Sequence, residues 1–118
     1  MAQVASASVI PFGAVASANW VDEHYTAPAT AIYSVNLSLT LYIKTAGDAD
    51  LAVQLIGDEV LAEQQWTETV SVGRRISLSL HWTGELKQGQ KLHFALATQG
   101  LGYGDIDFAS RSFSIVQI

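Results

Sequence analysis

Apolar and polar residues alternate along the centre of the chain. Between Tyr33 and Ile43 every odd position is apolar, whereas the even positions between them carry Ser, Asn, Ser, Thr and Tyr. The same alternation returns over Ile76–Trp82, Leu92–Leu96 and Phe113–Ile115. A period of two places the apolar side chains on one face of a strand. The pattern therefore predicts β-strands that each bury one face.

Helical spacing is weak throughout. The stretch Asp58–Gln65 is the best helix candidate, but its β-rich neighbours favour a strand. Glycine- and proline-containing turns separate the apolar segments, and about eight short strands without helices predict an all-β, antiparallel β-sandwich. The connection Asp22–Thr30 is expected to be a loop. The expected strands are Gln3–Ile10, Ala14–Trp20, Ile32–Lys44, Leu51–Ile56, Val60–Trp66, Thr69–Val72 with Arg75–Thr83 and a turn at Val72-Gly73, Lys91–Thr98 and Arg111–Ile118.

The shortage of charge changes the picture of the surface. Only 14% of the 118 residues are charged, against about 25% in typical soluble domains. The centres of protein–protein contacts are depleted in charged residues, so we expect partner subunits to cover part of this surface. A monomer whose surface is solvated by Ser and Thr is the alternative.

The first 21 residues, Met1–Val21, carry no charged side chain. Ser6, Ser8, Pro11 and Gly13 interrupt the apolar run that a secretory leader would need, and no run of about 18 apolar residues suggests a transmembrane helix. We therefore expect one domain over residues 1–118, beginning at Met1, with residues 1–21 as an uncharged N-terminal arm that includes the first strands. No membrane partner is expected.

Net charge and cysteine content exclude several functions. The formal net charge is −5 and the six basic residues are scattered, whereas nucleic-acid binding needs clustered Lys and Arg. No nucleic-acid partner is expected. The chain has no cysteine, which excludes disulfides, cysteine-ligated metals and a thiol nucleophile.

The C-terminal third carries a family resemblance. It reads Leu86-Lys87-Gln88-Gly89-Gln90-Lys91-Leu92-His93-Phe94, then a glycine-rich loop, then Ser112-Phe113-Ser114 near the chain end. Over residues 74–118 this resembles the closing strands of C1q/TNF-like jelly rolls, including trimeric fibre tips and capsid decoration (cement) proteins of tailed phages. Gln90 departs from the acidic residue usual after the turn glycine. The resemblance implies a jelly-roll-like, trimer-forming protein with a non-enzymatic structural role in a virion.

Candidate chemistry is sparse. His81 and His93 fall on the polar sides of successive expected strands and are expected to be cross-strand neighbours, while His24 lies in the expected loop. The pairs Asp48/Asp50 and Asp105/Asp107 are expected in glycine-containing loops, where solvated turns are a simpler interpretation than calcium. No nucleophile, phosphate-binding or metal-ligand motif occurs. We expect no enzyme activity, no catalytic residue, no metal site and no cofactor.

Two functions remain after these exclusions. The first is a capsid decoration protein at the virion surface, which contacts shell subunits or further copies of itself, with a trimer favoured. The second is a carbohydrate- or receptor-binding tip domain that stacks sugars on Trp20, Trp66 and Tyr103. In the first, aromatic and apolar residues of the arm and of the Gly100–Asp107 loop make the contacts. These interface residues are Val4, Val9, Ile10, Phe12, Trp20, Leu101 and Tyr103.

Overall fold

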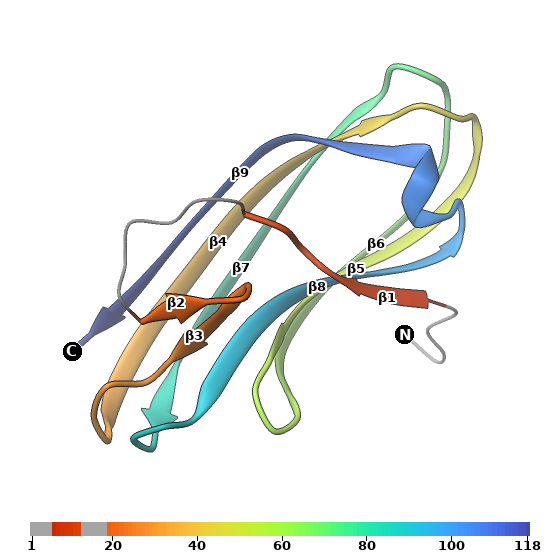
Figure 1. The fold of residues 1–118 in the computed structure, drawn as a ribbon. Helices are drawn as coiled ribbons and strands as arrows, with labels where there is room; N and C mark the ends of the chain where they lie inside the picture. The colour runs from red at the N-terminus through yellow and green to blue at the C-terminus, as the bar shows by residue number, and fades with distance from the viewer. Residues whose placement is uncertain (1–5, 13–18) are drawn as a thin grey trace.

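A computed structural model describes residues 6–12 and 19–118 of the chain. Over these residues nine strands and one short 3₁₀ helix, η1 (Tyr103–Asp105), follow one another (Figure 1). The strands are β1 (Ser6–Val9), β2 (Trp20–Val21), β3 (His24–Thr26), β4 (Ala31–Ile43), β5 (Gly47–Ile56), β6 (Val60–Val70), β7 (Arg75–Leu86), β8 (Lys91–Gly100) and β9 (Ile106–Gln117).

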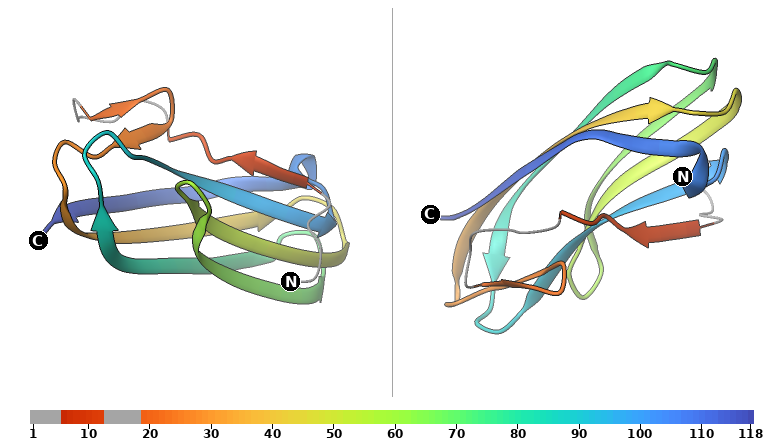
Figure 2. Two further views of the ribbon diagram at one scale, coloured as in Figure 1. Left: turned by 90° about the horizontal axis from the view of Figure 1, so that it is seen from below. Right: turned by 45° about the horizontal axis from the view of Figure 1, so that its top comes forward.

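The strands form two antiparallel sheets (Figure 2). The larger sheet has the order β2-β3-β8-β5-β6, and β1 pairs with β8 beside β3. The smaller sheet has the order β7-β4-β9, in which Leu37 of β4 lies opposite both Leu80 of β7 and Phe113 of β9. The prediction of an all-β, antiparallel β-sandwich is confirmed.

The core lies between the two sheets and is built from the inward positions of the long strands. The burial pattern of β4 follows the sequence alternation closely, because its odd positions from Tyr33 to Ile43 are all buried. In β7 the alternate apolar residues Ile76, Leu78 and Leu80 are buried as well. The largest fully buried side chains are Tyr33, Phe94, Ile10, Leu37, Leu39, Leu41, Ile43, Leu51, Leu55, Leu86, Leu92 and Leu96.

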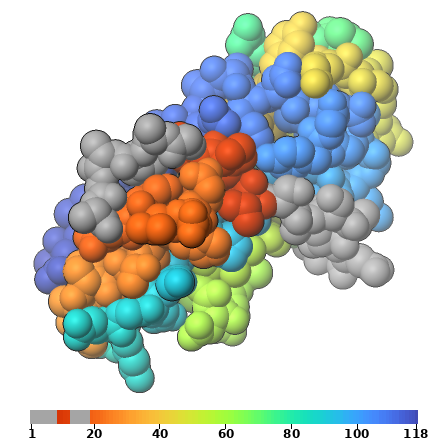
Figure 3. Space-filling model, in the orientation of Figure 1, coloured from red at the N-terminus to blue at the C-terminus, as the bar shows by residue number. Residues whose placement is uncertain are grey.

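The described part of the N-terminal arm completes this core. The Ile10 N–H donates to the Phe94 carbonyl at 2.9 Å, which keeps the segment on the edge of β8. Phe12 then packs edge-on against Phe113 of β9, with ring centroids 4.7 Å apart, and Trp20 stacks on the same ring at 4.6 Å. Residues 9–12 and β2–β3 cover the middle of the molecule in the space-filling view (Figure 3).

Glu23 ties the arm to the β2–β3 hairpin. Its carboxylate accepts a hydrogen bond from the Phe12 backbone N–H at 2.5 Å and a longer one, 3.4 Å, from the Trp20 indole N–H. Asp22 and Glu23 occupy the two-residue turn of this hairpin with positive φ angles of 52° and 62°. That conformation is typical of a tight type I′ hairpin turn, which favours Gly, Asn and Asp.

The structure corrects several element boundaries. The segment Asp22–Thr30 is not only a loop, because it contains β3, and residues 13–18 of the expected strand Ala14–Trp20 lie outside the described residues. Asp58–Gln65 contributes to β6, as expected. The expected strands Val60–Trp66 and Thr69–Val72 form one strand, β6, which ends at Val70. After the turn expected at Val72-Gly73, β7 begins at Arg75. Asp48 and Asp50 lie on β5, and Asp107 lies on β9, not in loops.

Candidate functional site

The outer face of the β7-β4-β9 sheet carries an ordered array of small polar side chains. Because the three strands are in register, the outward residues form rows across the sheet. We call the four central rows the hydroxyl face. The rows are Ser77–Thr40–Ser110, Ser79–Ser38–Ser112, His81–Asn36–Ser114 and Thr83–Ser34–Val116.

No Asp, Glu, Lys or Arg occurs in the hydroxyl face. Most of its side chains are exposed, and Ser34 and Thr40 are half-buried. Among the side chains of this face one hydrogen bond joins two strands: His81 Nδ1 of β7 lies 2.6 Å from Asn36 Oδ1 of β4. Because small side chains hardly rise above the backbone, a shallow hollow of about 200 Å³ forms at the middle, between Asn36, Ser38, Ser112 and Ser114.

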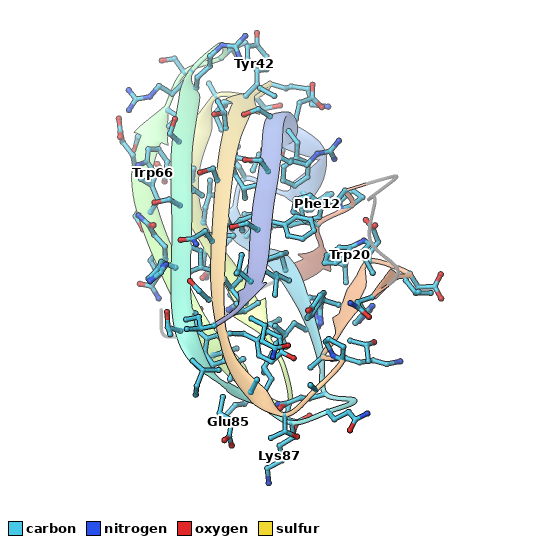
Figure 4. All side chains as sticks on the ribbon, turned by 90° about the vertical axis from the view of Figure 1, so that its left-hand side faces the viewer. Phe12, Trp20, Tyr42, Trp66, Glu85 and Lys87 are labelled. Carbon is cyan, nitrogen blue, oxygen red and sulfur yellow. The ribbon has the colours of Figure 1, made fainter. Side chains whose placement is uncertain are left out.

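Larger and charged residues lie at the two ends of this face. At one end the Arg75 guanidinium lies 5.5 Å from the centre of the Tyr42 ring, and Asp107 on the other side of Tyr42 pairs with Lys44 at 3.3 Å. At the opposite end Glu85 lies beside Ile32. Tyr42 and Glu85 mark these two ends in Figure 4.

Exposed apolar residues accompany Glu85. Ile32, Val116 and Ile118 are 43%, 55% and 73% exposed. They are neighbours, because the Ile118 N–H donates to the Ile32 carbonyl at 2.8 Å and Val116 lies opposite Ser34. The face therefore carries apolar residues and Glu85 at one end. The other end carries Tyr42, Arg75 and the Lys44–Asp107 ion pair, and no Asp, Glu, Lys or Arg lies between the two ends.

Several expected interface residues are core residues instead. Ile10 is 0% exposed, Trp20 is 8% exposed and Leu101 is 6% exposed. Ile10 belongs to the hydrophobic core cluster, and Trp20 lies against Phe94 of β8 and Phe113 of β9. The Leu101 side chain packs close to Gly47 at the start of β5. The sequence suggested exposure because these residues lie in segments of turn-like or irregular composition, but their side chains face inward.

The remaining interface residues have different environments. Val9 is 42% exposed at the end of β1. Phe12 and Tyr103 are half-buried against the core, and Tyr103 contacts Phe108 edge-on at 5.8 Å. Val4 lies outside the described residues. Of this group, Val9 alone offers a largely open apolar side chain among the described residues.

The three rings expected to stack on a sugar do not form a platform. Trp20 is buried beneath the arm, Trp66 is half-buried on β6 opposite Leu51, and Tyr103 belongs to η1. Figure 4 places Trp66 and Trp20 on opposite sides of the sandwich. No ring contact joins any two of the three within the described structure.

The histidines pair differently from the expectation. β7 and β8 belong to different sheets, so His81 lies beside Asn36 and not beside His93. His93 of β8 lies instead against His24 of β3, with ring centroids 4.8 Å apart. Burial and the neighbouring His24 ring lower the pKa of His93.

The acidic pairs have local roles. Asp48 and Asp50 accept hydrogen bonds from Thr69 at 2.7 Å and from Thr67 at 3.3 Å across the β5–β6 pairing. Asp105 accepts from the Gly102 N–H and from the Thr45 hydroxyl, and these hydrogen bonds lower its pKa. Over residues 6–12 and 19–118 no group of three or more His, Asp or Glu side chains is placed to hold a metal.

The hydroxyl face is the feature that sequence reasoning missed. Its signal was visible as Ser, Thr and Asn at alternate positions of three separate segments. What the sequence did not contain was the order of the strands, because β7 and β9 flank β4 although they are far from it in the chain. Only that order turns three polar stripes into one surface.

None of the helices in the described part of the chain has the length and apolar character needed to cross a membrane.

Comparison with known proteins adds no relationship to this picture. No protein-family model matches the sequence, and a search of curated proteins finds no match either.

Proposed function

We propose that the protein is a non-enzymatic structural protein that acts by protein–protein contact, and that its hydroxyl face packs against a second copy of the chain. The observation that carries this proposal is the uncharged centre of the face between ends of complementary chemistry. Interface centres are depleted in charged residues, and a contact between identical subunits must be complementary to itself.

A two-fold arrangement satisfies that condition. We place a two-fold axis in the plane of the contact, at right angles to the strands and between the levels of Ser38 and Asn36. Rotation about this axis brings the two faces together and reverses the strand direction of the second copy. The end carrying Arg75 and Tyr42 then lies over the end carrying Glu85 and Ile32 of the other copy. Each Arg75 gains an acidic partner and each Tyr42 an apolar one, twice per dimer. Packed sheets usually cross at an angle of about 30°, which would displace Arg75 sideways from Glu85 of the other copy. The Arg75 side chain is long enough to span this displacement.

The size of the face sets the expected strength. Three strands about 4.8 Å apart and eleven residues of about 3.3 Å each give a face of roughly 500 Å². Two copies would bury roughly 1,000 Å², which is near the lower limit for a specific contact. The expected dimer is therefore weak and depends on concentration.

The biological setting of this contact follows from the resemblance of residues 74–118. Phage cement proteins work by packing on a shell, which they stabilise by binding only its assembled state. We propose the same role and a virion location for this chain, with shell subunits or further copies as partners. The resemblance favours a trimer, whereas the two ends of the face favour a dimer, and the solution mass distinguishes them.

Sedimentation equilibrium over a wide range of protein concentration tests the proposal. The wild type is expected to pass from monomer to dimer, because the face is weak but complementary. Ser38→Arg places a charge at the centre of the face and should leave a monomer. Gln64→Arg, an exposed position on β6 of the other sheet, adds the same charge elsewhere and should dimerise like the wild type.

Two outcomes would overturn the proposed contact. One is a wild type that stays monomeric at all concentrations, which would identify the hydroxyl face as a solvated surface. The other is a dimer or trimer that Ser38→Arg leaves intact, which would place the contact on another surface.

A further inference from the structure

The two histidines of β3 and β8 form a pair outside the hydroxyl face. β3 pairs with β8 in the register Tyr25↔Leu92 and Thr26↔Lys91, so the next step of the antiparallel register brings His24 opposite His93. Their ring centroids are 4.8 Å apart. Directly opposite residues of an antiparallel pair are the positions from which two side chains reach one point above the sheet.

A hydrogen bond fixes the tautomer of His24. Its Nδ1 lies 2.7 Å from the Asp22 carbonyl oxygen, and a carbonyl oxygen only accepts, so Nδ1 carries the proton. Nε2 of a neutral His24 therefore keeps a free lone pair. Metal-binding histidines in proteins are commonly oriented in this way, with one ring nitrogen donating to a carbonyl and the other binding the ion.

His93 offers the second nitrogen. Its ring is half-buried on β8 and lies against the His24 ring. A hollow of about 290 Å³ lies beside His24 and is lined also by Asp22, Thr26 and Lys91. An ion bound to His24 would therefore be open to water on this side.

We propose that His24 and His93 bind a divalent transition-metal ion of the Zn²⁺ type through one imidazole nitrogen each. Imidazole suits zinc, copper and nickel, whereas calcium and magnesium prefer oxygen. The bound ion would link β3 to β8 across their short pairing, and would so hold the β2–β3 hairpin, with Trp20 and Glu23, at the edge of β8. This inference does not depend on the proposed dimer, because the pair lies on a different sheet.

Thermal unfolding with added ZnCl₂ tests the site on chelator-treated protein. Any ligand that binds the folded state alone raises the melting temperature. A shift of about 5 °C is expected at ten times the Kd. His24→Gln and His93→Gln should each remove most of this shift, whereas His81→Gln should keep it, because His81 lies on the other sheet beside Asn36. MgCl₂ should have no effect.

NMR of the histidine rings provides the second readout. Substoichiometric Zn²⁺ should shift or broaden the ring resonances of His24 and His93 and leave those of His81 unchanged. No Zn²⁺-dependent shift in melting temperature, or an equal shift in the wild type and in both substituted proteins, would overturn the proposal. Broadening of His81 alone would do so as well.

Discussion

Two glycines share nearly the same backbone conformation in different surroundings. Gly89 and Gly100 have φ angles of +87° and +85°, which residues with a Cβ rarely adopt. A Cβ on Gly89 would meet nothing within 4 Å, whereas a Cβ on Gly100 would lie 2.3 Å from the Asp48 carbonyl oxygen. That oxygen also accepts the Leu101 N–H at 2.9 Å. Gly100 is therefore required by packing as well as by conformation.

We predict that Gly89→Ala lowers the free energy of unfolding by about 1 kcal/mol through backbone strain alone. Gly100→Ala should cost a further 1–3 kcal/mol, roughly the effect of overpacking, because the Asp48 backbone must move. Urea unfolding, compared through the midpoint and slope, measures both. Equal losses in the two variants would contradict the close approach of β5 and β8.

At the scale of the element, the described part of the arm and the β2–β3 hairpin contribute to the core. Trp20 contacts Phe12, Phe94 and Phe113 with ring centroids at 5.8, 6.4 and 4.6 Å. An arm reserved for partners would leave such residues exposed. The lack of charge in residues 1–21 therefore has an internal cause at these positions, and truncation of the arm should unfold the protein, not merely abolish binding.

We predict that Trp20→Ala lowers the free energy of unfolding by about 3–5 kcal/mol, as for other large core aromatics. The adjacent Val21 is 62% exposed, so Val21→Ala should change the free energy of unfolding by no more than about 0.5 kcal/mol. Chemical unfolding followed by far-UV circular dichroism measures both. A Trp20→Ala protein as stable as the wild type would show that the arm does not belong to the core.

The long strands were predictable because each carries its own evidence. Tyr33–Ile43 alternates over its whole length, and β4 spans Ala31–Ile43. The short strand β3 was missed, because three residues are too few to display a period and its partner, β8, is distant in the chain. For the same reason the His24–His93 pair could not be predicted: the residue opposite His93 depends on register, which local pattern does not contain.

At the scale of the whole molecule, the low charge has two separate causes. Part of it belongs to the core, including the arm residues Ile10 and Trp20. The other part is the hydroxyl face, where exposed positions carry Ser, Thr, Asn and His in place of Lys and Glu. The composition signalled that much of the chain avoids charge, but it did not say which residues are inside. Only the second part supports a contact with another copy.

Exchange of the two end charges tests this contact most directly. In the proposed dimer Arg75 faces Glu85 of the second copy, so Arg75→Glu and Glu85→Arg each bring like charges together and should weaken dimerisation in sedimentation equilibrium. The double variant restores opposite charges and should recover dimerisation at low salt, where such pairs are least screened. A double variant no stronger than the single ones, or four proteins with the same mass, would contradict the proposed pairing.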